Sequence, residues 1–390
     1  MTEAVIQKNS GYARTVLTEA FKHWSARLGL IWIGVIAFFA VFAPFIASSQ
    51  PYLIKQAGVI SSPLLQYLTP ADVIILVIFL TFVTLLFLKK SLVFNTLALL
   101  AILIFASIVS YTFVKPPQIV VYEQYRVLQR EGKLDWVINA PIPYSAKDYL
   151  RDYGETGMEP PLTNPERTHL FGTEQSGADV LSRMIHACRI ALGIGFVATG
   201  IAMLIGVILG GLMGYFSGVV DMLGMRLVEI FEAIPTLFLL LTFVAFFGSS
   251  LYLMMVIIGV TTWPGYARFV RAEFLKLRKM EYVQSAIACG LPLHSILFKH
   301  MLPNGIAPVL VAASFGVASA ILYEAILSFL GLGASPGTAE WGLMISSGRV
   351  HMFHAWWYVT FPGLAILLVV LGFNLLGDGL RDVTDPKLRR

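Results

Sequence analysis

Residues 281–303 read EYVQSAIACGLPLHSILFKHMLP, a polar segment between two long apolar stretches. Helix-forming residues fill 281–289 and again 295–300, and Gly290 and Pro292 separate the two runs. Because glycine and proline interrupt helices, this spacing predicts two short helices joined by a turn at Gly290. The chain therefore carries a structured helix pair at a place where a simple connector would suffice.

The same segment has the features of a docking element. Pro303 is expected to close it before the next apolar span begins at Ile306. Connectors between neighbouring helices usually have about two to eight residues, whereas this loop extends over 268–303. Small residues at 285, 286 and 288 allow a partner groove to approach closely. A small apolar ridge is expected from Tyr282, Ala286, Ile287 and Cys289.

The composition is that of an integral membrane protein. The 390 residues are 57% hydrophobic and 13% charged, with a mean hydropathy of +0.75, whereas soluble domains have about 25% charged residues. A membrane-spanning helix needs roughly 20 apolar residues. Uncharged runs of that length occur at 28–54, 91–114, 190–220, 233–267, 301–323 and 355–377.

Two further features set the number of spans. The run 73–88 is short. It can still span the membrane, because the aliphatic chains of the flanking Lys89 and Lys90 can lie along the lipid while their charged ends reach the membrane–water interface. The run 233–267 is too long for one helix, and it is divided at Gly248-Ser249-Ser250. The sequence therefore predicts eight spans: 28–48, 71–89, 91–114, 190–215, 222–247, 251–267, 305–330 and 356–377.

The distribution of Lys and Arg predicts the orientation of these spans. Basic residues cluster in the N-terminal segment, at Lys89-Lys90, in 268–299 and in the C-terminal tail. With eight spans, all four clusters fall on the cytoplasmic side, so both termini are expected to be cytoplasmic and 115–189 extracytoplasmic. The net charge of +5 and the pI near 9.1 then reflect membrane orientation rather than nucleic-acid binding.

The N-terminal segment and the two cysteines complete this topology. No small-residue cleavage site precedes the first span, so the N-terminus is expected to act as an uncleaved anchor. Cys188 and Cys289 fall on opposite sides of the bilayer, and no intramolecular disulfide or metal site is expected.

Several motifs carry a resemblance to a known family. The 281–303 segment has the spacing Glu-Ala-Ala, three residues, Gly, nine residues, Ile-x-Leu-Pro, although a Gln replaces the Glu and a His replaces the Ile. Further motifs are HLFGTEQSGADVLSRM at 169–184, SFLGLGASPGTAEWG at 328–342 and GDGLRDVTDP at 377–386. Ala178 stands where the family usually has Arg. The chain resembles the permease subunits of oligopeptide/dipeptide ABC importers over about 169–388, with 28–48 as the family's first helix.

The resemblance implies an all-α membrane bundle: a type I importer core of six spans with an inserted two-span hairpin. It divides the chain into a cytoplasmic lead-in (1–26), a first core span (27–49), an insertion (50–189) that holds the hairpin (71–114) and an extracytoplasmic loop, a core (190–380) with the loop 268–303, and a tail (381–390). The hairpin lies outside the motif-bearing core and is expected to be peripheral to transport.

The resemblance also implies partners and a site. The implied partners are a second, homologous permease, two cytoplasmic ATPase subunits that hold ATP and Mg²⁺, an extracytoplasmic substrate-binding protein and membrane lipid. This chain would hold no cofactor and would not be an enzyme, and its place would be the bacterial or archaeal cytoplasmic membrane. Contact with the ATPases is assigned to Glu281, Tyr282, Gln284, Ser285, Ala286, Gly290, His300, Leu302 and Pro303.

Acidic residues at membrane depth are costly and indicate function. Glu324 is the deepest and is a candidate for the translocation path or for contact with the partner permease. Glu229 and Glu232 are expected in an ion-paired cluster with Arg226. A secondary, ion-coupled transporter that uses Glu324 or Glu232 is the alternative, but paired broken helices in repeated halves are not evident. An intramembrane enzyme is not supported, because no phosphate loop, HExxH or GxSxG motif is present.

Two remaining patterns are expected to be structural. Gly206, Gly210 and Gly214 recur at every fourth residue, which predicts close packing against another helix. His351 and His354 stand beside Trp356 and Trp357 and indicate an interfacial aromatic belt rather than a metal site.

Overall fold

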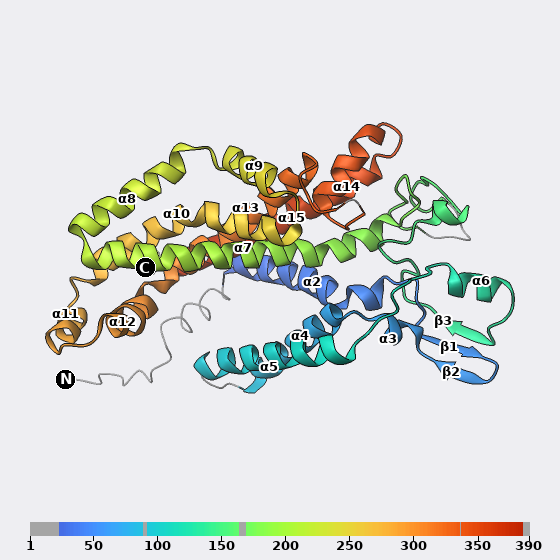
Figure 1. Ribbon diagram of the computed structural model, residues 1–390, viewed down its shortest axis with the longest axis horizontal. Coiled ribbons are helices and arrows are strands. Elements are labelled where there is room, and N and C mark those ends of the chain that lie inside the picture. The colour runs from blue at the N-terminus through green and yellow to red at the C-terminus, as the bar shows by residue number, and fades with distance from the viewer. Residues whose placement is uncertain (1–22, 89–91, 164–168, 336, 385–390) are drawn as a thin grey trace. The chain divides into compact units, whose positions relative to one another are not determined.

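The computed structural model describes residues 23–88, 92–163, 169–335 and 337–384 and is mostly helical (Figure 1). It divides into two compact units. Unit 1 comprises Met1–Gly34, Ala191–Pro336 and Gly363–Arg390, and unit 2 comprises Val35–Ile190 and Gly337–Pro362. Three helices contribute residues to both: α2 (Trp24–Ile46), α7 (Val180–Phe216) and α15 (Trp357–Thr384). Residues 1–22 of the predicted lead-in (1–26), the Lys89-Lys90 turn and the tail beyond residue 384 lie outside the described residues.

Unit 1 is built on long helices and contains the 281–303 segment. Its further elements are α8 (Gly218–Ala233), α9 (Thr236–Phe247), α10 (Leu251–Leu277), α11 (Glu281–Ala288), α12 (Leu293–Ser295), the π-helical stretch η2 (Ile296–Met301) and α13 (Leu302–Phe329). The glycine stripe of α7 packs on α10, because Gly206 faces Tyr266, Gly210 faces Ala267 and Gly214 faces Phe274. The predicted packing role of the stripe is confirmed.

Unit 2 adds a helical hairpin and a small sheet. Its elements are α3 (Pro63–Tyr67), α4 (Pro70–Leu88), α5 (Leu92–Phe113), α6 (Gln124–Arg130), the 3-10 turn η1 (Leu150–Tyr153), α14 (Trp341–Gly348), the 3-10 turn η3 (Arg349–His351), and the strands β1 (Leu53–Gln56), β2 (Val59–Ser61) and β3 (Trp136–Ile138). The strands form an antiparallel sheet in the order β2-β1-β3. The fold is therefore not purely helical, and the sequence prediction missed this sheet because its strands are only three or four residues long.

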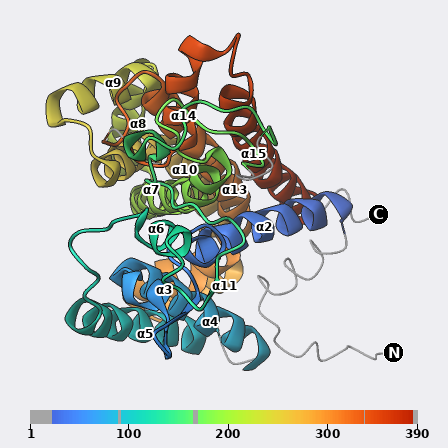
Figure 2. The ribbon, with the colours of Figure 1, turned by 90° about the vertical axis from the view of Figure 1, so that its right-hand side faces the viewer.

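The predicted hairpin over 71–114 is present, with α4 and α5 side by side (Figures 1 and 2). Its root is fixed to its neighbours. Thr69 and Asp72 cap α4 reciprocally, with Thr69 N donating to Asp72 Oδ2 at 2.8 Å, as in a capping box. The other oxygen of Asp72 pairs with Arg189 of α7, and Phe79 contacts Phe42 of α2. The peripheral role of the hairpin in transport stays a prediction. Asp72, at the base of the hairpin, has a structural role.

Within the described residues, six helices are long and apolar enough to cross a membrane: Trp24–Ile46, Phe94–Phe113, Val180–Phe216, Leu251–Leu277, Pro308–Phe329 and Trp357–Val383. The predicted span 222–247 is bent rather than continuous, because α8 and α9 meet at 80°; that the pair crosses the membrane as one span stays a prediction. The helix predicted to start at 190 starts at Val180, where Asp179 accepts a hydrogen bond from Ser182 N at 2.7 Å and caps the helix. Pro70–Leu85 is a shorter apolar helix.

Candidate functional site

The predicted turn at Gly290 forms a well-defined helix cap. Gly290 N donates to Ile287 O at 2.9 Å and Leu291 N donates to Ala286 O at 3.2 Å, the two hydrogen bonds of a Schellman motif. Gly290 has φ +69°, a left-handed conformation that glycine adopts without the steric cost paid by other residues. Residues 286–291 alone therefore end α11 and redirect the chain.

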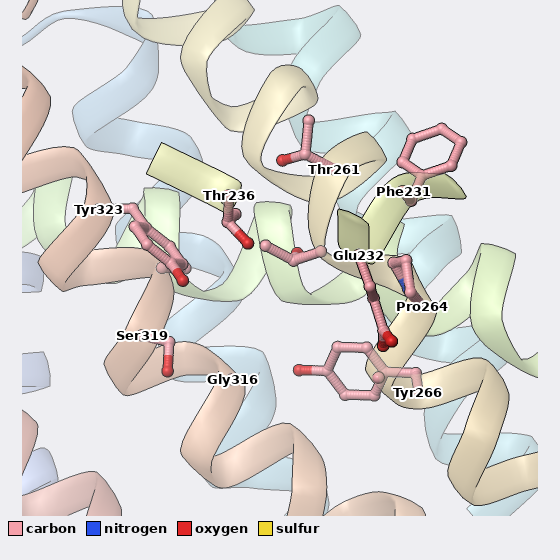
Figure 3. Close-up of a pocket in the computed structure, with 12 residues that line it drawn as sticks. Phe231, Glu232, Thr236, Thr261, Pro264, Tyr266, Gly316, Ser319 and Tyr323 are labelled. Atoms are coloured by element: carbon pink, nitrogen blue, oxygen red, sulfur yellow. The ribbon is translucent and has the colours of Figure 1, made fainter. Parts of the chain in front are cut away.

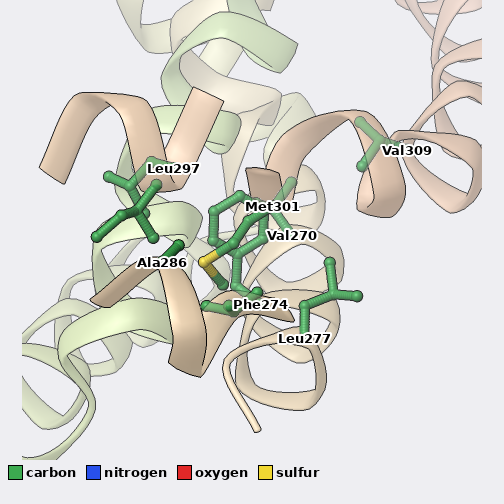
Figure 4. Packing of buried hydrophobic residues seen from close by; sticks show 9 residues of the cluster. Val270, Phe274, Leu277, Ala286, Leu297, Met301 and Val309 are labelled. Atoms are coloured by element: carbon green, nitrogen blue, oxygen red, sulfur yellow. The ribbon is translucent and has the colours of Figure 1, made fainter. Parts of the chain in front are cut away.

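The 281–303 segment is packed into unit 1 by one hydrophobic cluster (Figure 4). Val283 and Ala286 of α11 face inward, with Val283 fully buried. They meet residues of α10, η2 and α13, and the buried members are Val270, Phe274, Leu277, Val283, Ala286, Ile296, Leu297, Met301 and Val309. Burying one such aliphatic side chain contributes about 1.5–3 kcal/mol. The segment is consequently part of the core of unit 1 rather than a free loop.

The opposite face of α11 is exposed and holds four of the nine predicted contact residues. Tyr282 is 41% exposed and Ile287 37% exposed, and Glu281, Gln284, Ser285 and Cys289 are also exposed. Ala286 does not belong to this ridge, because it is buried; with a helical period of 3.6 residues, it lies on the same face as Val283. Burial raises the pKa of Tyr282, and its hydrogen bond with Asn304 opposes that change.

Gln284, at the family's Glu position, has a local structural use. Its Nε2 donates to Arg278 O at 2.7 Å, which ties the start of α11 to the end of α10. A carboxylate could not make this bond, because it has no hydrogen to donate at neutral pH. Ser285 Oγ donates within the helix to Glu281 O at 2.8 Å.

The end of the segment differs from the prediction. Pro303 does not close it, because Pro303 lies in the first turn of α13, where a proline needs no amide hydrogen. His300 falls within η2, whose residues Ile296–Met301 lead directly into α13. Leu302 is half-buried beside the cluster. The second half-helix is therefore continuous with the following span, joined by a π-helical stretch of the kind often found at functional sites.

Two arginines connect α10 and its C-terminal turn to the start of α8. Arg271 forms a two-point ion pair with Asp221, with Nη2 to Oδ2 at 2.6 Å. Arg278 Nη1 donates to Ser217 Oγ at 2.7 Å. Ser217, between α7 and α8, has φ +52°, which is strained for a non-glycine residue. The elbow between α7 and α8 is thus held by the helix that leads into α11.

Glu232, at the other end of α8, pairs with Arg268 of α10. The predicted cluster is confirmed for Arg226 and Glu229, which pair at 2.5 Å on the surface; Glu232 takes a different partner from the one its sequence position suggested. Ion pairs therefore hold α8 to α10 near both of its ends.

The break between α8 and α9 lies at Ile234-Pro235. Ile234 has ψ +124°, because a residue that precedes proline is disfavoured in the helical region. Pro235 then starts α9. Pro235 lies within the predicted span and is a sequence signal for this break. The prediction missed it because the apolar run continues on both sides of the proline.

A cavity of about 240 Å³ lies beside this break. Figure 3 shows side chains of α8, α9, α10 and α13 around it. Glu232 and Gly316 also line it, and hydroxyl groups come from Thr236, Thr261, Thr262, Tyr266, Ser319 and Tyr323. The cavity therefore offers uncharged hydrogen-bonding groups and one ion-paired carboxylate.

Glu324 is next to Tyr323 in sequence but is not among the residues that line this cavity. It is buried, with 3% exposure, and its Oε1 accepts a hydrogen bond from Ser328 Oγ at 2.9 Å. Its predicted place on the translocation path stays a prediction. Within the described part of the chain, no group of His, Cys, Asp or Glu side chains is arranged to hold a metal ion, and His351 and His354 belong to no such group.

Two family models match the chain. "Binding-protein-dependent transport system inner membrane component" matches residues 206–390, and "N-terminal TM domain of oligopeptide transport permease C" matches residues 11–67. Both the first span and the 281–303 segment lie within the matched regions. The α4–α5 hairpin lies between them.

Relatives with named functions match at about 40% identity. The dipeptide transport permease DppC of Alkalihalophilus pseudofirmus is 41% identical over 61% of this chain and 78% of the relative. The oligopeptide permease OppC of Haemophilus influenzae is 42% identical over 57% and 72%, and the glutathione permease GsiD of Pectobacterium atrosepticum is 39% identical over 64% and 80%.

Among solved structures, an inward-facing MetNI methionine ABC transporter matches 52% of this chain and 97% of that chain at 21% identity, with a TM-score of 0.43. The sequence relatives carry the assignment. With 41% identity across 78% of a relative, the chain is a multi-pass membrane protein that belongs to the oligopeptide/dipeptide permease family, the inner-membrane components of binding-protein-dependent transport systems.

Proposed function

We propose that this chain is a permease subunit of an ATP-driven importer of dipeptides, oligopeptides or peptide-like solutes. A binding protein delivers the solute from outside, and a second, homologous permease completes the path. Two cytoplasmic ATPase subunits bind ATP and Mg²⁺, so this chain carries neither the catalytic site nor a cofactor. The proposal of a peptide substrate is supported by the names of the relatives, which transport dipeptides, oligopeptides and the tripeptide-like glutathione.

The proposal rests mainly on the two different faces of α11. One face is locked into the core of unit 1 by Val283 and Ala286, while the other face is exposed. A short helix with an exposed face and a fixed angle at Gly290 suits insertion into a groove on a partner. Because the same cluster includes residues of α10 and α13, a push on α11 is transmitted to both helices as a rigid movement.

The ion pairs extend this movement to the cavity. Arg271 of α10 holds the start of α8 through Asp221, and Arg268 holds its end through Glu232. Because α8 ends at the break beside the cavity of about 240 Å³, a displacement of α10 would reshape that cavity. We assign the solute path to this region, with Glu324 as a candidate residue beside it.

The proposed topology has eight spans and cytoplasmic termini. The six long helices, the bent α8–α9 pair and the short Pro70–Leu85 helix together make up this number. With the N-terminus inside, the 281–303 segment faces the ATPases and residues 115–179 face outward.

Reconstitution tests the function directly. The tagged chain is purified with the ATPases, permease and binding protein that accompany it, and the complex is placed in proteoliposomes. We expect dipeptide uptake that requires ATP and is unchanged by a protonophore. Uptake driven by a proton gradient in the absence of ATP would instead favour the ion-coupled alternative.

We expect Gly290→Val to lower coupled ATP hydrolysis about tenfold, without loss of the assembled complex. A Cβ atom at 290 would meet no atom within 4 Å, so we expect the effect to come from the backbone. At φ +69° an ordinary residue costs about 1–2 kcal/mol, and 1.4 kcal/mol is a factor of ten. Gly290→Asn is the matched control, because asparagine tolerates this conformation. Equal turnover of both variants with the unmodified complex would refute the role of the turn.

Cysteine labelling tests the orientation. In a background with Cys188→Ala and Cys289→Ser, single cysteines replace Lys133 and Lys279, both exposed. An impermeant maleimide added to sealed right-side-out vesicles should label position 133 and leave position 279 unlabelled until the membrane is permeabilised. Labelling of position 279 from outside would overturn the eight-span topology.

A further inference from the structure

A further cavity, of about 220 Å³, lies in unit 1 beside the second half of the 281–303 segment. Its walls come from α7, α10, α12, η2 and the first residue of α13. Apart from His294, the residues that line it are apolar or glycine. The cavity is smaller than the pockets that hold drug-sized ligands, about 300–1,000 Å³. It therefore suits a slender hydrocarbon group rather than a polar solute.

The cavity opens to the surface of unit 1. Three of the residues that line it have exposed side chains, because Phe298 is 53% exposed, Ile208 44% and Leu293 36%. Phe274 and Leu297 also line it but are buried, and both belong to the hydrophobic cluster shown in Figure 4. An occupant thus enters past an apolar rim and rests on the cluster that holds the 281–303 segment in place.

The cavity adjoins the lipid-facing surface of the protein. Helix α7 is long and apolar enough to cross a membrane, and its uncharged run continues through the part that lines the cavity. Leu204, one turn before Ile208 on the same face of α7, is 62% exposed. In a multi-pass membrane protein, a row of exposed apolar side chains on such a helix contacts lipid. The rim of the cavity continues this row, so acyl chains have direct access to it.

Two nitrogen-bearing side chains lie at the same place. His294 lines the cavity, and Lys299 directly follows Phe298 and is exposed. A lysine ammonium and an imidazole can both donate hydrogen bonds to a phosphate oxygen. Basic side chains between membrane helices attract the headgroups of anionic lipids.

The two main walls carry no acidic residue that would oppose this attraction. The sequence has no Asp or Glu over 180–216, which is α7, or over 282–323, which contains α12, η2 and the start of α13. In the remaining wall, α10, Glu273 pairs with Lys276 at 3.9 Å. The mouth of the cavity therefore favours an anion.

We propose that this cavity binds one acyl chain of an anionic phospholipid, with the phosphate group beside Lys299 and His294. The chain occupies space that the side chains leave empty and gains van der Waals contacts there, and the phosphate forms charge-assisted hydrogen bonds. Because Phe274 and Leu297 belong to both the cavity and the cluster, the bound lipid stabilises the second half of the 281–303 segment. The site requires only that the chain is a membrane protein, so it does not depend on the solute proposed above.

Native mass spectrometry of the delipidated full-length chain in detergent, without ATPase subunits, tests the headgroup preference. The probes are phosphatidylglycerol and phosphatidylcholine that carry identical palmitoyl and oleoyl chains. We expect one saturable site that prefers phosphatidylglycerol about fivefold, the effect of one lysine near the headgroup. Lys299→Gln should abolish this preference, whereas Lys279→Gln, which changes an exposed lysine before α11, should keep it.

Val207→Phe tests the cavity itself, because the larger ring occupies the space of the acyl chain. We expect it to remove the saturable binding of both lipids. Val197→Phe is the matched control on α7, because Val197 is 45% exposed and does not line the cavity. Phosphatidylglycerol should raise the melting temperature of the unmodified chain and of Val197→Phe, since a ligand stabilises the fold that binds it, but not that of Val207→Phe.

Three results would overturn the site. The first is equal affinity for the two lipids, and the second is saturable binding that Val207→Phe leaves intact. The third is an equal loss of preference in Lys299→Gln and Lys279→Gln, which would indicate a diffuse attraction to the basic surface. If Val207→Phe yields no folded chain, the two lysine variants still give the answer, because both lysines are exposed.

Discussion

Gly210→Leu is expected to remove most of the folded protein from the membrane, with at least a tenfold fall in the monodisperse peak recovered in detergent. A Cβ atom at 210 would lie 2.9 Å from Ala267 Cα and 3.0 Å from its carbonyl carbon. Because these are backbone atoms, no side chain can rotate away and α7 must separate from α10. Overpacking a core costs about 1–3 kcal/mol of stability, occasionally more. Because leucine adds several atoms beyond Cβ, we expect a cost at the upper end of this range.

Gly200→Leu provides the control on the same helix. Gly200 has no atom within 4 Å of the position of a Cβ, so the two variants share their change in helix propensity and differ in contact. Fluorescence-detected size exclusion and thermal melting of both variants measure the difference. Wild-type yield and melting temperature in Gly210→Leu would show that α7 and α10 do not pack through this stripe in the membrane.

Arg271→Ala is expected to lower ATP-dependent uptake at least tenfold while the ATPase subunits still co-purify with the chain. The side chains of Arg271 and Asp221 are 28% and 17% exposed, between a surface pair, worth about 0–1 kcal/mol, and a buried one, whose disruption costs about 3–5 kcal/mol. Without the pair, the start of α8 no longer follows α10, although the Arg268–Glu232 pair at its other end and the docking face of α11 are unchanged.

The swapped pair Asp221→Arg with Arg271→Asp tests this reading, because it restores the attraction with the charges exchanged. We expect it to recover a substantial part of the uptake lost in each single variant. Arg226→Ala is the control: its pair with Glu229 is exposed, at 71% for the arginine side chain, and its loss should change uptake less than twofold. Equal ATP-dependent uptake by Arg271→Ala and Arg226→Ala would show that α8 does not take part in the coupling.

Features that depend on neighbouring residues could be predicted from the sequence. Most spans are readable because a backbone in lipid must satisfy its own hydrogen bonds, so each crossing needs one long apolar helix. The turn at Gly290 is readable because its bonds involve only residues 286–291. The packing stripe at Gly206, Gly210 and Gly214 is readable because small residues four apart share a helix face. Pro235 was an equally local signal, and the prediction missed it.

The tertiary structure alone decided which faces meet. The Arg271–Asp221 pair joins residues 50 positions apart, and the Ser49–Asp148 bond joins residues 99 positions apart. Neither spacing repeats in the sequence, because such contacts depend on the rotation and offset of whole helices rather than on a local period. For the same reason, Val207 and Leu302 read as ordinary apolar residues of two separate runs. The cavity that both of them line exists only once α7 and the start of α13 are packed together.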